Sequence, residues 1–357
     1  MEQTPLFQLN LMLWLVWPAP TIGDVRPVFR EAGFALHAIG QDLVLPLETR
    51  ARTGAADIPT KERVNPDLLL AHRPAAIFLP IECKISSFGP DVLLGDAKHQ
   101  ARQTAALLSL TGPYLADRFG LPSANNWRGY LLYAVGGGQE AAMQVTLNEL
   151  TERLRQAHVE PTASGALGIH IREDGVYLQP AADADPPLLS FPSDRAAGLK
   201  VMRLEPGDDP RPLYLIPWDP SVGASSDEYE LRAVEERVRS AVIALIGSRL
   251  DATSFNVSLD EILRAAIEVW DVWRDREATA GFRNAVRAYV RRVLAQLRRL
   301  GLMIETGQDT FAFAQITPEA AQRVRRYLSS STFRRGEIDL TSAAVQMDFG
   351  SLAEGWL

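Results

Sequence analysis

The chain has 357 residues, a hydrophobic fraction of 46% and a charged fraction of 23%, values typical of globular proteins with packed cores. This length favours two domains over one. The single cysteine, Cys83, excludes a disulfide framework and a cysteine-based zinc site, and the five histidines show no pair at zinc-ligand spacing. The net charge of −7 argues mildly against a nucleic-acid partner, so the local distribution of basic residues matters more than the total.

The first part of the chain begins with an apolar run from Leu11 to Trp17, which is too short to cross a bilayer and lacks a basic flank. We therefore interpret it as a buried helix or strand rather than a signal peptide, and we expect a cytoplasmic protein with no membrane partner. A short helix is predicted from Asp24 to Ala32, ending at Gly33, and Phe34 to Leu47 has the character of a strand.

The clearest pattern lies between Ile77 and Ile85, where the odd-numbered residues are all apolar and share one face of a predicted strand. Glu82 and Lys84 share the opposite face, so a carboxylate and an ammonium group project together. Pro80 lies inside this strand and removes one ladder hydrogen bond, so we expect a bulge or a locally unpaired edge there.

A second strand is predicted from Asp67 to Ala71, and the turn at Arg73-Pro74 would fold it back against the first. Asp67 would then lie beside Glu82 at one end of the hairpin, close to Lys84. This arrangement suits phosphodiester hydrolysis, because two carboxylates can bind a hard divalent cation and a lysine can orient or deprotonate the attacking water.

Pro66-Asp67, followed by Glu82-Cys83-Lys84, resembles the motif of the PD-(D/E)xK nuclease superfamily, in the form of its Mrr-like and Holliday-junction-resolvase-like members. The resemblance covers roughly residues 20 to 180. It implies an α/β fold with a restriction-endonuclease-like mixed sheet flanked by helices. It also implies that Asp67 and Glu82 bind Mg²⁺ (or Mn²⁺), that the backbone carbonyl of Cys83 assists, and that Lys84 serves the water.

A helix is predicted from Asp91 to Leu110, and many members of the superfamily carry a glutamine on this helix. We assign that role to Gln100, which we expect on the face turned toward the core, with Gln103 as the neighbouring alternative. A helix-capping or packing amide is the other interpretation of Gln100. Many members also use a glutamate of the first helix as a metal ligand. Glu31 fits that location, and an ordinary surface carboxylate is the alternative interpretation.

Further along the chain, Gly129 to Val135 is a predicted strand and Gln139 to Ala157 a predicted helix. The Gly136-Gly137-Gly138 run between them is not followed by Lys-Ser/Thr, so we interpret it as a plain turn rather than a phosphate loop. Gly165 to Leu178 predicts a hairpin with its turn at Asp174-Gly175.

Residues 181–224 are rich in Pro, Asp and Gly, and we interpret them as a linker or peripheral segment after a nuclease-like domain at residues 1–180. Residues 225–335 predict a mainly helical domain that resembles a winged helix-turn-helix, and residues 336–357 form an acidic tail. The predicted elements of this second domain are helices at Asp227 to Leu250, Ser258 to Trp273 (with a capping box at Ser258–Glu261), Ala278 to Leu300 and Thr317 to Leu328, and strands at Leu302 to Glu305 and Thr310 to Phe313.

The third of these helices is strongly basic. Between Arg274 and Leu300, eight arginines and two acidic residues give a local net charge of +6 (8 − 2). We predict DNA contacts there, with a solvated helix face or a protein-binding surface as the alternative. The predicted DNA-binding residues are Arg283, Arg287, Arg291 and Arg292.

These patterns together predict an Mg²⁺-dependent deoxyribonuclease, an endonuclease acting in bacterial restriction, phage defence or a mobile element. A partner protein of a defence or transposition complex, or a second copy of the chain in a homodimer, is compatible with that role. The alternative is a catalytically inactive nuclease-fold subunit that binds DNA or scaffolds a complex through its winged helix. A winged-helix transcription regulator with a sensor domain explains Asp67, Glu82 and Lys84 poorly.

Overall fold

The computed structural model describes the chain in two compact units, Met1–Leu213 with Asp219–Ser221 and Val272–Arg276, and Tyr214–Trp218 with Val222–Asp271 and Glu277–Leu357. The described residues are 4–17, 25–55, 58, 60–88, 98–205, 215–216, 228–252, 254–273, 284, 286–288, 290–291, 294–295, 298, 304–307, 309–313 and 317–328. None of the helices within these ranges is long and apolar enough to span a membrane.

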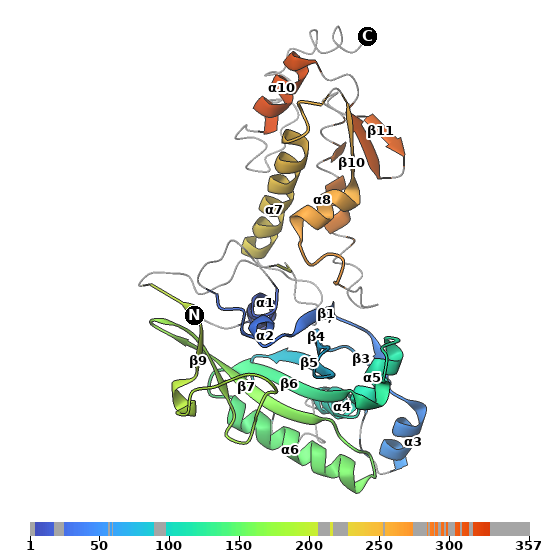
Figure 1. Cartoon of the computed structure of the whole chain (residues 1–357), viewed down its shortest axis with the longest axis vertical. Coiled ribbons are helices and arrows are strands. Elements are labelled where there is room, and N and C mark those ends of the chain that lie inside the picture. Colours follow the sequence, from blue (N-terminus) through green and yellow to red (C-terminus); the bar gives the residue numbers. More distant parts are fainter. Residues whose placement is uncertain are drawn as a thin grey trace. The chain divides into compact units, whose positions relative to one another are not determined.

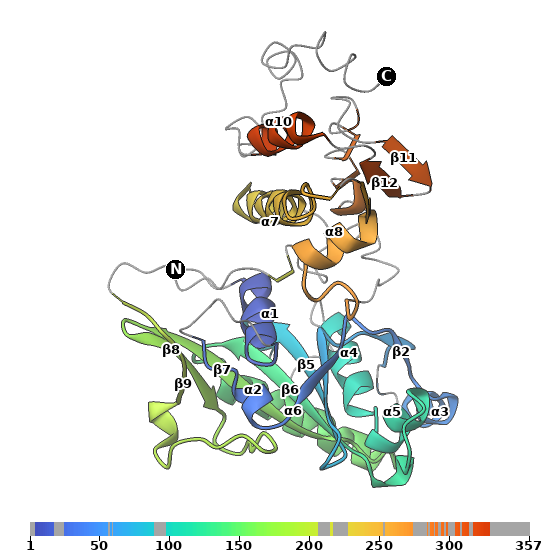
Figure 2. The same cartoon turned by 45° about the horizontal axis from the view of Figure 1, so that its top comes forward.

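The first unit is built on a seven-stranded mixed sheet with the strand order β1-β4-β5-β6-β7-β8-β9. The central strands β5, β6 and β7 run parallel to one another, and the flanking pairs are antiparallel. Figure 2 shows β8 and β9 beside each other at one edge. The strands are β1 (Ala35–Ile39), β4 (Leu68–His72), β5 (Ile77–Lys84), β6 (Arg128–Gly136), β7 (Ala163–Arg172), β8 (Gly175–Pro180) and β9 (Leu199–Arg203), with a separate pair β2 (Leu43–Val44) and β3 (Arg63–Val64).

Helices cover both faces of this sheet, which confirms the expected mixed α/β class. α1 and α2 lie on one face, and α4 and α6 lie on the other (Figure 1). Their bounds, with those of the shorter helices, are α1 (Pro5–Trp14), α2 (Val28–Glu31), α3 (Leu47–Ala55), α4 (Lys98–Leu108), α5 (Gly112–Arg118) and α6 (Glu140–Gln156).

The apolar run near the N-terminus is a buried helix, one of the two alternatives expected for it. Thr4 caps α1, since its hydroxyl oxygen accepts a hydrogen bond from the Phe7 N–H at 3.1 Å. Residues 11–16 are all buried. Residues 7–14 of α1 are also buried, Gln8 and Asn10 included, and the helix packs against β5.

The main hydrophobic core lies between the sheet and the layer of α4 and α6. Phe78 and Tyr133 enter it from β5 and β6, and Ala105 and Leu147 enter it from the two helices. Strand β5 is central and is buried on both faces, so the face that carries Glu82 is not solvated, in contrast to an ordinary surface strand. That face changes from apolar at Phe78 to polar toward its carboxyl end.

Pro80 is accommodated by a short lapse in the pairing of β5 with β6. The parallel ladder skips residues 79–80 and resumes in the same register. On the other side, Pro80 remains opposite Leu69 of β4. A proline has no N–H to donate, so the locally unpaired edge expected from the sequence is the arrangement found.

Several elements of the first unit differ from the sequence-based expectations. The strand predicted over residues 34–47 is divided into β1 and β2 near Gly40, which has a positive φ of 62°. The helices α3 and α5 were not predicted. The predicted glycine turn is present at residues 136–138, and residues 181–205 contribute the edge strand β9. Residue 24, where the first short helix was expected to begin, lies outside the described residues. So do residues 91–97 of the helix predicted from Asp91 to Leu110.

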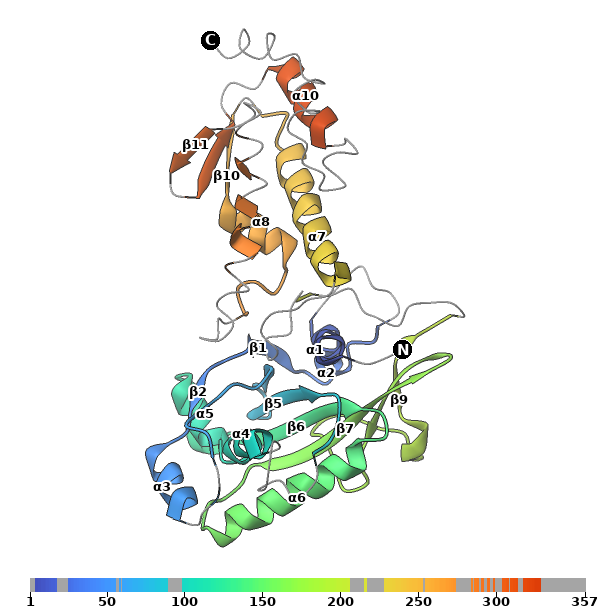
Figure 3. The ribbon, with the colours of Figure 1, turned by 180° about the vertical axis from the view of Figure 1, so that it is seen from behind.

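The second unit combines helices with a three-stranded antiparallel sheet of order β10-β12-β11 (Figure 3). The predicted wing strands are present as β11 and β12, and β10, which the sequence did not predict, pairs with β12. The predicted acidic tail 336–357, together with Arg283 and Arg292, lies outside the described residues. The elements are α7 (Glu228–Gly247), β10 (Phe255–Ser258), α8 (Leu259–Ala266), β11 (Ile304–Gly307), β12 (Thr310–Phe313) and α10 (Pro318–Leu328).

The helix α8 ends earlier than predicted, at Ala266 instead of Trp273. Ile267 leaves the helical region with φ −130° and ψ 95°, and residues 268–272 form turns. Trp270 and Trp273 are buried in this non-helical segment. Their apolar spacing continued the helical pattern in the sequence, but their burial is achieved by turns.

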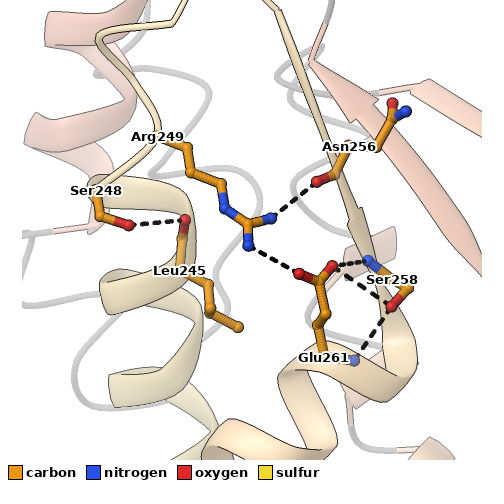
Figure 4. A network of polar contacts seen from close by, with 6 residues as sticks. All are labelled: Leu245, Ser248, Arg249, Asn256, Ser258 and Glu261. Carbon is orange, nitrogen blue, oxygen red and sulfur yellow. Dashed lines mark hydrogen bonds and ion pairs between the residues drawn. The ribbon is translucent and has the colours of Figure 1, made fainter.

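The junction of α7, β10 and α8 is held by a polar network around Arg249 (Figure 4). The Arg249 guanidinium donates to the carbonyl oxygen of Asn256 at 2.9 Å and to Glu261 Oε1 at 2.8 Å. Glu261 and Ser258 form the capping box predicted from the sequence, with N–H to side-chain distances of 3.0 and 3.2 Å.

Candidate active site

The candidate site begins at the carboxyl end of β5, where Glu82 and Lys84 project from the same face of the strand. Lys84 Nζ lies 2.8 Å from Glu82 Oε1. The Glu82 side chain is 1% exposed and that of Lys84 is 21% exposed. A buried carboxylate of this kind requires a charged or hydrogen-bonding partner, and the strand geometry supplies one two residues away.

Asp67 joins this pair from the neighbouring strand. Leu68 is opposite Ile81 in the β4–β5 ladder, so the preceding residue, Asp67, lies next to Glu82. Asp67 is 3% exposed, and its Oδ2 accepts a hydrogen bond from the Cys83 N–H at 2.7 Å. The turn at residues 73–76 thus brings the two acids of the motif together.

The backbone N–H of Cys83 points toward the neighbouring strand, on the side where Asp67 lies. In a β-strand, the N–H and C=O of one residue point toward the same neighbouring strand. The N–H of Cys83 points to the Asp67 carboxylate, so its carbonyl oxygen lies on that side as well. The thiol is buried, as expected for a small packed side chain.

The charge of Lys84 is set by both acids. Burial by itself lowers the pKa of Lys84, but the carboxylates of Glu82 and Asp67 outweigh it and hold the pKa well above its ordinary range. Lys84 is therefore an ammonium group at any physiological pH. Because both carboxylates act on it, the three side chains form one electrostatic group.

A glutamine of α4 completes the contacts of Glu82, and it is Gln103. Gln103 Nε2 donates to Glu82 Oε1 at 2.8 Å. The expectation that Gln100 turns toward the core is wrong: Gln100 lies in the first turn of α4 and is exposed. The buried face of the helix is formed by Ala101, Thr104 and Ala105, and Gln103 borders that face on the side of Glu82.

Lys61, which the sequence analysis did not single out, also reaches the site. Lys61 Nζ donates to Gln103 Oε1 at 3.1 Å. Lys61 lies in an irregular stretch before β3, where no periodic pattern marks a buried or converging side chain. Its position six residues before Asp67 (67 − 61) is the only sequence signal that could have drawn attention to it.

Tyr133 of β6 lies beside Glu82 in the sheet. The two residues are register partners in the β5–β6 ladder, and the Tyr133 hydroxyl is 2.5 Å from Thr104 Oγ1. Burial and the nearby Glu82 carboxylate raise the pKa of Tyr133, so the phenol stays neutral. A neutral, hydrogen-bonded ring at this position adds no further negative charge to the acids.

Glu31 does not join the site. It lies on α2, which covers the sheet face opposite to that of Glu82 (Figure 1), and it forms an exposed ion pair with Arg26 at 2.7 Å. The surface-carboxylate interpretation of Glu31 fits this position.

A second polar pair lies on the same sheet face. His170 Nε2 is 3.2 Å from Glu140 Oε1, and Glu140 is the first residue of α6. In the sheet, Lys84 of β5 pairs with Val135 of β6, and Val135 pairs with Gly168 of β7. His170 lies two residues after Gly168. The alternation of strand side chains therefore places His170 and Lys84 on one face at the carboxyl end of the parallel strands.

The two predicted DNA-contacting arginines that are described make contacts within the second unit. Arg291 binds Asp309 in the turn between β11 and β12 through two hydrogen bonds of 2.9 and 2.7 Å. The Arg287 guanidinium lies over the Trp270 ring, 5.1 Å from its centroid. Arg291 is exposed and Arg287 is half-buried.

The donor set of the first unit fits a hard divalent cation. Within the ranges that the structure covers, no group of three or more His, Cys, Asp or Glu side chains is placed to hold a metal. Asp67 and Glu82 supply two buried carboxylates, which suffice for Mg²⁺ when waters and a substrate phosphate complete its coordination. Each carboxylate has about four lone-pair sites, so it can accept hydrogen bonds and bind a cation at the same time.

Comparisons of the chain with protein-family models, with curated proteins and with solved structures give no match.

Proposed function

We propose that the chain is a metal-dependent DNA endonuclease of the PD-(D/E)xK type. The observation that carries the proposal is the convergence of two buried carboxylates, Asp67 and Glu82, with the ammonium group of Lys84 at the end of a central strand. The mixed sheet with helices on both faces agrees with the core of that superfamily. Such an activity fits bacterial restriction, phage defence or a mobile element.

Asp67, Glu82 and the carbonyl oxygen of Cys83 would hold Mg²⁺, or Mn²⁺ in its place. When bound, the cation supplies polarisation of the phosphoryl oxygen and a lowered pKa for a coordinated water. Lys84 donates hydrogen bonds and offsets the negative charge that develops on the phosphate. Without a metal, the Glu82 and Asp67 carboxylates raise the pKa of Lys84, so Lys84 is a charged donor in that state.

We assign DNA binding to the second unit. Its described elements, helix, strand, helix and a two-stranded wing, with helical residues at 284, 286–288, 290–291, 294–295 and 298 before the wing, support a winged-helix assignment. Between Glu277 and Leu300, six arginines and one acidic residue give a local net charge of +5 (6 − 1), which supports phosphate contacts.

Plasmid cleavage in Mg²⁺ and in Mn²⁺ tests the proposal. Glu82→Gln and Lys84→Ala should each reduce cleavage about 100-fold or more, the usual scale for removing one group that stabilises a developing charge. Glu152→Gln, an exposed change on α6 with the same loss of one negative charge, is the matched control and should cleave like wild type. Cleavage that survives both active-site substitutions would overturn the proposal. DNA binding without cleavage and without metal binding would favour the inactive, DNA-binding subunit.

A further inference from the structure

Lys61, Gln103 and Glu82 form a continuous chain of hydrogen bonds into the candidate active site. Lys61 Nζ donates to Gln103 Oε1 at 3.1 Å, and Gln103 Nε2 donates to Glu82 Oε1 at 2.8 Å. The chain thus runs from a cation, through an amide, to the buried carboxylate. The three residues come from an irregular segment, from α4 and from β5.

The two ends of the chain fix the orientation of the amide between them. An amide oxygen only accepts hydrogen bonds, and an amide nitrogen only donates them. If Gln103 were flipped, its NH₂ group would face the Lys61 ammonium and its oxygen would face the Glu82 carboxylate. Both contacts would be repulsive, so Lys61 and Glu82 together favour the orientation in which the NH₂ group points at Glu82.

The backbone of Lys61 is docked independently of its side chain. The Lys61 N–H donates to the carbonyl oxygen of Arg102 on α4 at 3.3 Å. Two residues later, β3 pairs with β2 through Val64 and Leu43. A change of the Lys61 side chain therefore leaves these backbone anchors in place, and its effect on the site can be measured in a folded chain.

We infer that Lys61 is a positioning residue of the active site, which holds Gln103 so that its amide orients the Glu82 carboxylate for the divalent cation. This inference rests on the proposed function, because it concerns the same metal-binding carboxylate. Groups that hydrogen-bond to a metal ligand fix its orientation, and their removal typically weakens metal affinity about 10- to 100-fold. Lys61 acts one step further out, through Gln103.

A double-substitution cycle tests the inference, with Mn²⁺ affinity measured by calorimetry and the kcat and KM of plasmid cleavage measured alongside. Lys61→Met and Gln103→Met should each weaken Mn²⁺ binding about 10-fold. The double variant should lose clearly less Mn²⁺ affinity than the sum of the two single losses, because Lys61 orients Glu82 through the Gln103 amide. Lys61→Arg, which keeps a cationic donor, should restore most of the affinity.

Lys200→Met is the matched control, since it removes a lysine that is paired with an acid at the far edge of the same sheet. It should leave Mn²⁺ affinity unchanged. Wild-type Mn²⁺ affinity in Lys61→Met, or fully additive losses in the double variant, would overturn the inference. If Lys61→Met melts at a lower temperature than wild type, the Lys61→Arg result decides in its place.

The failure of this inference is distinguishable from that of the proposed function. If Glu82→Gln changes neither Mn²⁺ affinity nor cleavage, the proposed function is wrong and the inference fails with it. If Glu82→Gln abolishes both and Lys61→Met changes neither, only the positioning role of Lys61 is wrong.

Discussion

At the scale of single residues, Lys84 lies between two carboxylates that have little access to solvent. Its ammonium group contacts Glu82 directly and is also stabilised by Asp67. Removing one partner of a buried ion pair leaves an uncompensated charge, which is far more costly than losing a pair at the surface.

Lys84→Met should therefore destabilise the first unit by about 3 kcal/mol in metal-free buffer, because Glu82 and Asp67 would then face each other without a cation. Millimolar Mn²⁺ should recover more stability in this variant than in wild type, since the metal replaces the lost positive charge. Urea denaturation with and without Mn²⁺ measures both effects. Equal stabilisation of the two proteins by Mn²⁺ would contradict this prediction.

The raised pKa of Lys84 also sets the pH range over which this side chain stabilises the folded state. A group whose pKa is higher in the folded state contributes its full stabilisation below its ordinary pKa, here 10.5, and loses it as the pH rises through the folded value. The stability difference between wild type and Lys84→Met should therefore stay constant from about pH 7 to pH 10. A difference that falls within that window in urea denaturation would contradict a folded-state pKa of Lys84 above 10.5.

The residues of the motif could be read from the sequence because strand alternation is simple: Glu82 and Lys84 had to share a face. The glutamine was harder to place. Gln100 and Gln103 are three residues apart, so they differ by only about 60° around the helix axis, and a small error in helical phase exchanges them. Lys61 could not be found, because its contact depends on an irregular segment reaching α4, and no local pattern encodes that.

At the scale of elements, the start of α6 is packed closely against β7. A methyl group on Gly168 would lie 2.4 Å from Glu140 Oε2, and the other oxygen of that carboxylate, Oε1, already bonds His170. The carboxylate at the start of the helix therefore occupies the space that a side chain on the strand would need.

Gly168→Ala should destabilise the first unit by about 1–3 kcal/mol, since the buried carboxylate and its histidine must shift. Gly54→Ala is the matched control. Gly54 lies on α3 with no atom within 4 Å of the added methyl group, and this change should stabilise by about 0.5–1 kcal/mol through helix propensity. Thermal unfolding followed by circular dichroism compares the two, and equal shifts of the same sign would refute the packing argument.

In the second unit, Asp309 holds Arg291 through a bidentate ion pair, and this pair lowers the pKa of Asp309. If Arg291 contacts DNA, Asp309 competes with a phosphate for the same guanidinium. Asp309→Asn should then strengthen duplex binding and steepen the dependence of log K on log salt by about 0.9. Glu205→Gln, which removes one charge beside an exposed arginine in the first unit, is the control. Fluorescence anisotropy that shows identical salt slopes for both variants would count against Arg291.

Elements with local signals were predicted well, and those with distant partners were not. The β4–β5 and β7–β8 hairpins are closed by short turns whose residues mark them in the sequence. Strand β10 has four residues and forms its hydrogen bonds with β12, far along the chain. No turn or second strand next to β10 in the sequence therefore indicates a hairpin. The helix α8 was overextended because the buried tryptophans after it continued its apolar spacing.

At the scale of the whole molecule, the acidic first unit carries the candidate chemistry, and the basic segment from Glu277 onward belongs to the second unit. Cleavage and binding should therefore be separable. Glu82→Gln should bind duplex DNA like wild type in metal-free buffer, whereas Arg287→Gln with Arg291→Gln should reduce affinity and lower the salt slope by about two. Arg155→Gln with Arg203→Gln removes the same charge from exposed positions in the first unit and serves as the control. Equal losses in both double variants would point to net charge rather than to a binding surface.

The parallel pairing of β5 with β6 joins residues that are distant in the chain, whereas β4 and β5 are joined by a turn at residues 73–76. Distant pairings carry a larger loop-closure entropy and form later during folding. We therefore expect Asp67 and Glu82 to become neighbours early, before α4 docks and brings Gln103 to them. On this expectation the two acids, with Lys84 on the same hairpin, meet in water before the helix encloses them.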